Sequence, residues 1–317
     1  MKLLTLQDGD DFHPAVLVGE DALDLVKAQA HIDMAANIPN SMRALLAGGQ
    51  ETLAMIQKVI DQASKPEVAG NLKYAGALVA FDSANLGPVV PDPKLFLSSG
   101  ANSYGHVAEM GDKPPEEPFA FFKAPSAISA SGKDILLPKN HSDMVDWEGE
   151  FCAVIGKHCH QVSEEEAPDY IVGYTLTNDV STREYSVKFA QTRGANQITT
   201  VTAWQHLCFG KSFPTFAPVG PVITTTDEMP WPLKYKMETL VNGEVMQSCD
   251  QEDLVFNPAQ MIAFLSDFVA FEPGDIISMG SPPGVGFART PPVYLKSGDV
   301  VDIRVKEIGT LRNGVSK

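Results

Sequence analysis

The sequence predicts an α+β protein with a small N-terminal domain followed by a larger, strand-rich domain. Asn242-Gly243 lies between apolar residues, as in a tight β-hairpin, and Gly-Asp precedes β-branched runs at 274–275 and 298–299. These runs predict consecutive strands of an antiparallel roll. The prolines of residues 87–93 are incompatible with a helix interior and indicate a linker. We therefore assign residues 1–90 to the small domain and residues 91–317 to the larger one.

Hydrophobic spacing predicts the individual elements in chain order. Residues 2–6 and 14–18 are expected to form paired short strands, and residues 51–62 have the apolar spacing of a helix. Near the C-terminus, Asn257 is an N-cap candidate for a helix that starts at Pro258. Another helix is expected to begin within 163–166, where Ser and Glu have capping-box spacing.

Composition excludes several classes of function. The 317 residues include 24 Lys plus Arg against 40 Asp plus Glu, a net charge of -16, so the cationic surface of a nucleic-acid binder is missing. The 4 cysteines are too few for a disulfide scaffold and fit a reducing compartment. We see no signal peptide or membrane-spanning segment. A cytoplasmic protein without nucleic-acid or membrane partners is expected.

Two glutamates in the strand-like segment 146–156 are the first candidates for chemistry. Alternate residues of a strand share a face, so Glu148 and Glu150 point the same way. Like charges about 4 Å apart repel by roughly 4 kcal/mol at a surface-like dielectric, so the pair requires a proton, a cationic side chain or a metal ion. A hard divalent cation prefers such carboxylate oxygens. The alternative is a solvated outer strand face.

Two further segments carry candidate site residues. Residues 173–183 form a strand-like run that includes Asp179, although an Asn-Asp pair is also common in turns. If the loop 100–111 ends in a helix, His106 and Glu109 are neighbours, and the carboxylate can orient the imidazole as a general base. The alternative for this pair is an ordinary surface contact.

The order of these motifs resembles the fumarylacetoacetate hydrolase superfamily, from about Leu95 to Gly314. The individual motifs are weak signals, whereas the ordered set is strong. The matching segments are Gly100 to Glu109, Lys123-Ala124-Pro125, Glu148-Gly149-Glu150, Gly173 to Ser181, Lys211-Ser212 before Gly220-Pro221, Asn242 to Glu244, and Gly280 to Gly286.

The resemblance implies a mixed β-roll, usually a homodimer, and a role for each matching residue. It places a divalent metal, such as Mg²⁺ with Mn²⁺ or Ca²⁺ as alternatives, on Glu148, Glu150 and Asp179. It also implies that His106 and Glu109 activate water. Lys211 would lie near a developing oxyanion. The substrate would be bound by four further residues: Tyr104, Lys123, Gly280 and Ser281.

The expected activity is hydrolysis of a carbon–carbon bond in an acylpyruvate or related 2,4-dioxo acid through an enolate stabilised by the metal, in catabolism of aromatic compounds or sugars. Decarboxylation of an oxaloacetate-like acid and isomerisation of a 2-hydroxydienoate are alternatives on the same site. A non-enzymatic binding protein is a third. The motifs leave the distal group of the small anionic substrate undecided.

One position departs from the family pattern. Ser186 stands where the family usually has a glutamine near the active site, and residues 187–209 form a longer segment than expected. Gln191, Gln197 and Gln205 are candidates for the missing amide.

Overall fold

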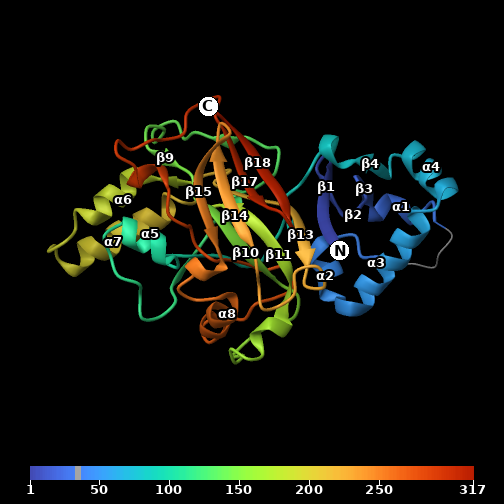
Figure 1. Cartoon of the computed structure of the whole chain (residues 1–317), viewed down its shortest axis with the longest axis horizontal. Helices are drawn as coiled ribbons and strands as arrows, with labels where there is room; N and C mark the ends of the chain where they lie inside the picture. Colours follow the sequence, from blue (N-terminus) through green and yellow to red (C-terminus); the bar gives the residue numbers. More distant parts are fainter. Residues whose placement is uncertain (33–36) are drawn as a thin grey trace.

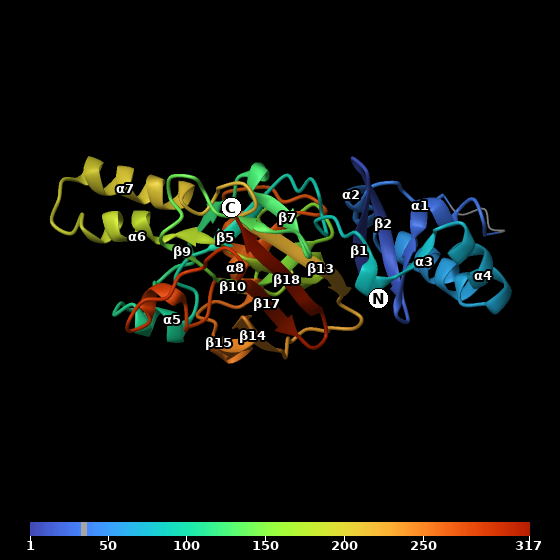
Figure 2. The ribbon, with the colours of Figure 1, turned by 90° about the horizontal axis from the view of Figure 1, so that it is seen from above.

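The computed structural model describes residues 1–32 and 37–317. Figure 1 shows the N-terminal elements as a lobe at one end of an elongated molecule, and the hairpin of helices α6 (Arg183–Ala190) and α7 (Gln197–Phe209) at the opposite end. The second view in Figure 2 agrees. Most strands lie between them. None of the described helices is long and apolar enough to cross a membrane.

An 11-stranded sheet runs through both parts of the chain. Its path is β4 (Leu78–Ala80), β3 (Asp21–Asp24), β2 (Asp11–Val18), β1 (Lys2–Asp8), β13 (Ala217–Thr225), β11 (Ile171–Asn178), β10 (Gly149–Ile155), β16 (Ile276–Ser278), β5 (Phe96–Ser99) and β6 (Ala120–Phe122), with β7 (Ile128–Ala130) beside β13. The predicted strands at 2–6 and 14–18 are confirmed as the pair β1 and β2. Because Leu3 of β1 pairs with Ile223 of β13, the sheet crosses the boundary proposed near residue 90, which stays a prediction.

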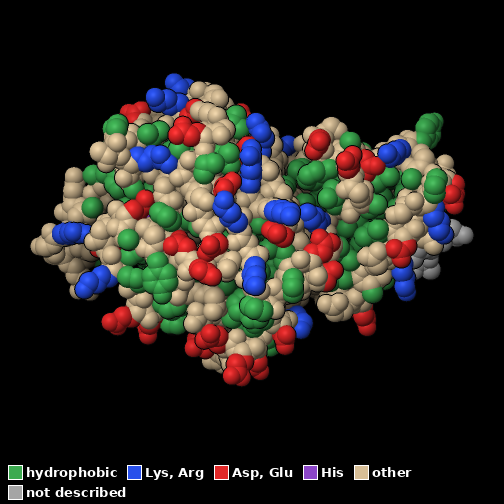
Figure 3. Space-filling model, in the orientation of Figure 1, with side chains coloured by type: hydrophobic (Ala, Val, Ile, Leu, Met, Phe, Trp, Pro, Cys, Tyr) green, Lys and Arg blue, Asp and Glu red, His purple; other side chains and the backbone are tan. Residues whose placement is uncertain are grey.

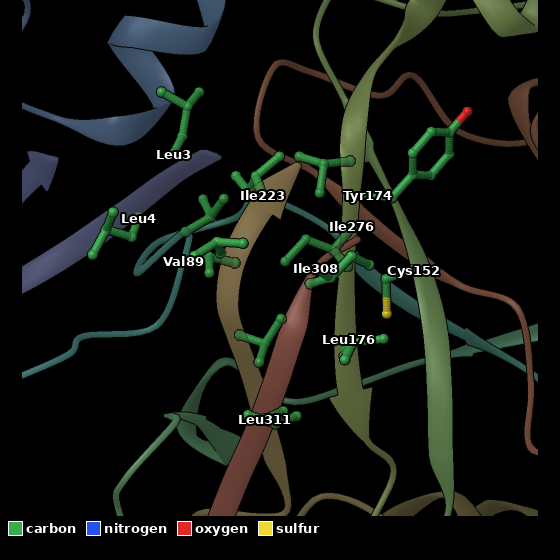
Figure 4. Close-up of a cluster of buried hydrophobic side chains, with 14 of the residues drawn as sticks. Leu3, Leu4, Val89, Cys152, Tyr174, Leu176, Ile223, Ile276, Ile308 and Leu311 are labelled. Carbon is green, nitrogen blue, oxygen red and sulfur yellow. The ribbon is translucent and has the colours of Figure 1, made fainter. Parts of the chain in front are cut away.

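A 5-stranded sheet covers the central strands. Its order is β15 (Glu244–Asp250), β14 (Lys236–Val241), β17 (Val300–Val305), β18 (Gly309–Ser316) and β8 (Ile135–Leu136). The two sheets approach closely at Gly149, where an added Cβ would lie 2.0 Å from Thr239 Oγ1. Leu176, Ile223, Ile276 and Leu311 are buried among the residues labelled in Figure 4.

The remaining elements are helices and a short strand pair. The pair is β9 (Val145–Asp146) with β12 (Ser181–Thr182). The α-helices are α1 (Leu25–Ala28), α2 (Met42–Ala47), α3 (Gly49–Ala63), α4 (Pro66–Tyr74), α5 (Tyr104–Glu109), α6 (Arg183–Ala190), α7 (Gln197–Phe209) and α8 (Pro258–Ser266). The 3₁₀ turns are η1 (Phe81–Ser83), η2 (Pro125–Ala127), η3 (Ala167–Tyr170), η4 (Gln251–Asp253) and η5 (Gly286–Ala288).

Most of the local predictions are confirmed. The predicted helix at 51–62 lies within α3, and Asn257 caps α8 through a complete capping box. Asn242 and Gly243 have φ of 53° and 84° between β14 and β15, as a tight hairpin turn requires.

Two local predictions are wrong. Ser163 and Glu166 exchange the expected capping hydrogen bonds, but only the 3₁₀ turn η3 follows them. The strands after the two Gly-Asp dipeptides are not consecutive in one antiparallel sheet. Instead β16 lies parallel to β5 in the large sheet, while β17 belongs to the small one. Both dipeptides mark strand starts correctly, but pairing partners are chosen by long-range packing.

Candidate active site

Three carboxylates meet where strands β10 and β11 adjoin. Gly149 pairs with Asn178 in the ladder, so Glu148, just before β10, lies beside Asp179, just after β11. Asn178 Oδ1 also accepts a hydrogen bond of 2.9 Å from the Glu148 N–H. Oxygens of Glu148, Glu150 and Asp179 lie within 4.8 Å of one another. The three side chains are buried, with relative exposures of 4%, 1% and 1%, so a solvated strand face is the wrong interpretation of the glutamates.

Three cationic side chains neutralise two of these acids. Arg183 Nη2 donates to Glu148 Oε1 at 2.5 Å, and Lys211 Nζ contacts both Glu148 Oε2 and Asp179 Oδ2, the latter at 2.8 Å. Lys123 Nζ donates to Asp179 Oδ1 at 2.5 Å. Burial by itself raises the pKa of Glu148, but Arg183 and Lys211 outweigh it and hold that pKa well below its ordinary value. Glu148 is therefore ionised.

Glu150 has only hydroxyl partners among the described residues. Ser98 Oγ donates to its Oε2 at 3.1 Å, and Ser278 Oγ donates to the same atom. Burial raises the pKa of Glu150 well above its ordinary value, and the nearby charges of Asp179 and Glu148 raise it further. The site thus holds a carboxylate that lacks a compensating cation. Three hard oxygen donors, one of them without a cationic partner among the described residues, suit a divalent cation. Glu148, Glu150 and Asp179 would hold it.

Burial disfavours the charged form of both lysines, and this by itself lowers their pKa values. It lowers the pKa of Lys123 from its ordinary value, despite the attraction of Asp179. Burial also disfavours the charged form of Lys211, but Asp179 and Glu148 outweigh it, so the pKa of Lys211 is raised. Lys211 is therefore the more firmly charged of the two.

A histidine–glutamate pair lies on α5. Ser103 caps this helix by accepting the His106 N–H at 2.9 Å, and Asp253 accepts from Ser103 Oγ at 2.5 Å. His106 Nδ1 lies 2.7 Å from Glu109 Oε1, so the predicted neighbourhood of the two residues is confirmed. Glu109 Oε2 also accepts the Gly284 N–H at 3.0 Å, which joins the pair to the glycine-rich loop 280–286. These contacts fix the orientation of the imidazole.

Two acids of the triad and the histidine of the pair face one cavity of about 860 Å³, whereas Asp179 and Glu109 lie outside its lining. Glu148, Glu150, Lys211 and His106 all line it, with helices α6 and α7 forming much of the outer wall. Such a volume lies in the upper part of the range of about 300–1,000 Å³ typical of small-molecule sites.

The comparisons with known proteins decide the family. The model described as "Fumarylacetoacetate (FAA) hydrolase C-terminal" matches residues 96–316. The chain belongs to this family. Members of the fumarylacetoacetate hydrolase family are enzymes, and the mixed α/β structure with its open sheets is consistent with the C-terminal fold of that family.

Individual members of the fumarylacetoacetate hydrolase family differ in activity. The chain is 32% identical over 303 residues to "Oxaloacetate tautomerase YisK" of Bacillus subtilis, covering 95% of this chain and 94% of the relative. It is 37% identical over 261 residues to "2,4-didehydro-3-deoxy-L-rhamnonate hydrolase" of Sphingomonas sp., covering 82% of each. A solved maleylpyruvate hydrolase from Sphingobium sp. SYK-6, in complex with manganese(II) ion and pyruvate, has a TM-score of 0.70 and 26% identity, covering 100% of this chain and 99% of that one.

The structure gathers most of the residues suggested by the family resemblance, but not all. Ser281 lines the cavity and its Oγ accepts from Gln247 Nε2 at 2.9 Å, whereas Lys123 lies behind the lining, against Asp179. Tyr104 is 51% exposed and is not among the lining residues, so the structure does not bring it to the site. Gly280, with φ of 85°, is also outside the lining and shapes the turn beside Ser99.

Sequence reasoning missed several residues that support the site. Arg183 joins Glu148 to the fully buried Asp146, which also accepts the Gly286 N–H at 2.7 Å. The need of paired glutamates for a cation was a usable signal, but nothing in the sequence singled out Arg183. Ser98 and Ser278 were missed because serines in strands are common.

Ser186 and the three glutamines considered for the missing amide can be placed relative to the cavity. Ser186 lines the cavity, whereas Gln191, Gln197 and Gln205 are not among the lining residues. None of the three therefore replaces the amide. The extra length of 187–209 forms α6, the following turn and α7 instead.

Proposed function

We propose that the protein is a divalent-metal-dependent hydrolase that cleaves a carbon–carbon bond in an acylpyruvate or related 2,4-dioxo acid. The observation that carries the proposal is that His106, oriented by Glu109, lines the same cavity as Glu148 and Glu150 of the buried carboxylate triad. Hydrolysis requires a base to activate water beside a site that stabilises negative charge, and this cavity has both. The manganese and pyruvate named for the Sphingobium structure support the same chemistry.

Glu148, Glu150 and Asp179 would hold the metal. When bound, a divalent cation supplies a Lewis acid that polarises the oxygens of a 2-oxo acid and stabilises negative charge on them. Lys211 adds a fixed positive charge near the developing oxyanion, and the Ser281 hydroxyl would bind the substrate carboxylate or a carbonyl oxygen. Lys123 lies behind the lining and holds Asp179 in place, so the substrate contact expected of it from the resemblance is not proposed. Buried cations act strongly here because the surroundings exclude water.

His106 would act as the general base. With its Nδ1–H donated to Glu109, Nε2 carries the lone pair and accepts a proton from water. The resulting hydroxide adds to carbon 4 of the substrate, the bond between carbons 3 and 4 breaks, and carbon 3 receives the proton from His106. The products are a carboxylic acid and pyruvate, and Glu109 stabilises the imidazolium between the two transfers.

Keto–enol tautomerisation of oxaloacetate is a second candidate function. It is favoured by the Bacillus relative, which matches over 95% of this chain. His106 would then move a proton at carbon 3 and no water would be consumed. Decarboxylation and dienoate isomerisation remain alternatives on the same triad, whereas membership of an enzyme family disfavours the non-enzymatic binding protein.

The deciding experiment is an ultraviolet assay of a panel of acylpyruvates and oxaloacetate, each with Mg²⁺, Mn²⁺ or EDTA. Metal-dependent release of pyruvate from an acylpyruvate supports the hydrolase, and Glu148→Gln should abolish it. Rapid enol–keto exchange of oxaloacetate without acylpyruvate cleavage would replace the hydrolase by the tautomerase. Full activity of Glu148→Gln would overturn the site assignment.

Three further expectations belong to this proposal. We propose Mg²⁺ or Mn²⁺ as the metal, a homodimer as the assembled form, and a cytoplasmic role in catabolism of aromatic compounds or sugars. The oxygen-only donor set supports the choice of metal. The homodimer and the pathway rest on the family resemblance.

A further inference from the structure

The α6–α7 hairpin extends the active-site cavity away from the triad. Arg183, the first residue of α6, contacts Glu148, and α7 ends just before Lys211, which contacts Glu148 and Asp179. The hairpin therefore starts and ends at the triad, and Figures 1 and 2 both show it projecting from the body of the molecule. The five helical steps from Trp204 to Phe209 span about 8 Å, so Trp204 lies away from the triad end of the hairpin.

One face of each hairpin helix lines the cavity. On α6 these residues are Ser186, Phe189, Ala190 and then Arg193 just beyond the helix; on α7 they are Thr200, Trp204 and Leu207. Their separations of three, four and seven residues place them on a single stripe of each helix. By contrast, Ile198 of α7 is 79% exposed and lies in a groove on the outer face.

Three aromatic side chains form the wall of this outer part. The Trp204 ring lies 5.7 Å from that of Phe119 and 5.6 Å from that of Phe189, with interplanar angles of 66° and 62°. Both pairs are edge-to-face, the arrangement that aromatic rings favour. Val107 and Met110 of the α5 segment add to the apolar lining. An apolar ligand that displaces water from this surface binds favourably, because apolar area is removed from water.

Charge in this outer part is balanced. Among the described residues that line it, the charged side chains are Asp112 and Arg193, which lie 3.7 Å apart in an exposed pair. The other lining cations, Arg183 and Lys211, are already bound to the triad. Figure 3 shows basic side chains on the outer surface at this end of the molecule, but among the described residues 185–209 only one of them, Arg193, lines the cavity. A distal carboxylate would meet the Asp112–Arg193 pair, which has no net charge, rather than an unpaired cation.

We propose that the aromatic wall formed by Phe119, Phe189 and Trp204 is a distal subsite that selects an uncharged apolar acyl group, of the size of an aromatic ring, on the 2-oxo acid. The proposal rests on the proposed function for the position of the 2-oxo acid at the triad. Trp204 is the main specificity-determining residue, because its ring packs against those of both Phe119 and Phe189. Oxaloacetate and dicarboxylic acylpyruvates are then poor ligands of the subsite.

Turnover with matched substrates tests the selection. Benzoylpyruvate, acetylpyruvate and 2,4-dioxoheptanedioate share the reacting end and differ in an aromatic, a methyl and a carboxylate tail. We expect Trp204→Ala to lower kcat/KM for benzoylpyruvate by about 10- to 100-fold, mainly through KM, and to change that for acetylpyruvate by less than about 3-fold. Trp204→Phe should restore most of the loss, and Ile198→Ala on the outer face of α7 is the matched control.

Binding without turnover separates this inference from the proposed function. Phenylpyruvate has no carbon-4 carbonyl and cannot be cleaved, so calorimetry with Mn²⁺ compares its Kd with that of pyruvate. Tighter binding of phenylpyruvate that Trp204→Ala abolishes supports the subsite even if no acylpyruvate is hydrolysed. Equal Kd values for the two acids would overturn the subsite while leaving hydrolysis intact. An equal loss for all three substrates in Trp204→Ala, or a wild-type preference for 2,4-dioxoheptanedioate, would also overturn it.

Discussion

Replacement of Glu150 by glutamine should have opposite effects with and without metal. The oxygens of the triad lie within 4.8 Å of one another, and at an effective dielectric of about 20 each like-charged pair at that distance repels by roughly 3.5 kcal/mol. Arg183, Lys123 and Lys211 offset this repulsion at Glu148 and Asp179, whereas Glu150 responds with a raised pKa. We therefore expect Glu150→Gln to stabilise the metal-free protein by about 1–2 kcal/mol, or about 2–4 °C in Tm.

With metal bound, we expect the wild type to be more stable than Glu150→Gln. A free Mn²⁺ concentration 100 times the Kd stabilises the wild type by about 2.7 kcal/mol, or about 5 °C. The amide offers one neutral oxygen in place of a charged carboxylate, so a 100-fold weaker site would gain only about 0.4 kcal/mol at the same concentration. The Ser98 and Ser278 hydroxyls still have an oxygen acceptor in the variant, which limits structural damage.

Differential scanning fluorimetry at pH 7.5, in EDTA and across a Mn²⁺ titration, measures both effects. Glu244→Gln, in the exposed hairpin, controls for the loss of one negative charge. A lower Tm of Glu150→Gln in EDTA would refute the view that Glu150 is electrostatically strained. An undiminished Mn²⁺ shift would refute its role as a ligand.

Three more predictions address the base, the buried arginine and pH. His106→Ala should lower hydrolysis by about 10²–10⁴-fold while leaving the Mn²⁺ shift in Tm unchanged; a lost shift would place His106 in the metal site instead. Arg183→Met leaves Asp146 buried without its cation, so urea unfolding should show a loss of about 3–5 kcal/mol, and a loss below about 1 kcal/mol would contradict the structural role of that pair. The pKa of Glu150 is raised from its ordinary 4.5, so this carboxyl loses its proton at a lower pH in the unfolded chain than in the folded protein. The free energy of unfolding in EDTA should therefore fall as pH rises above about 4.5. Glu150→Gln should flatten that slope in a Tm series from pH 4 to pH 8, and an unchanged slope would assign it to another group.

The local predictions succeeded where short-range geometry decides the outcome. A strand places residues two apart on one face, and a helix brings residues three apart together, which is why the pairs Glu148 with Glu150 and His106 with Glu109 could be predicted. The ordered motifs then supplied Asp179, Lys123 and Lys211 from their resemblance to the family. Tyr104 shows the limit of such transfer, because a matching letter in a motif does not bring its side chain into the cavity.

The sequence by itself determined the family, the strand and helix starts, and the identity of the three acids. Only the tertiary structure decided that those acids are buried and that Arg183 and two lysines neutralise two of them. It likewise decided that Glu150 is left with hydroxyl partners among the residues that the structure describes. It also decided that β16 lies parallel to β5 and that α6 and α7 wall the distal cavity. The physical reason is distance along the chain: periodicity and capping depend on neighbours within a few residues, whereas burial and ion pairing depend on groups that pairing of the β10 and β11 strands brings together.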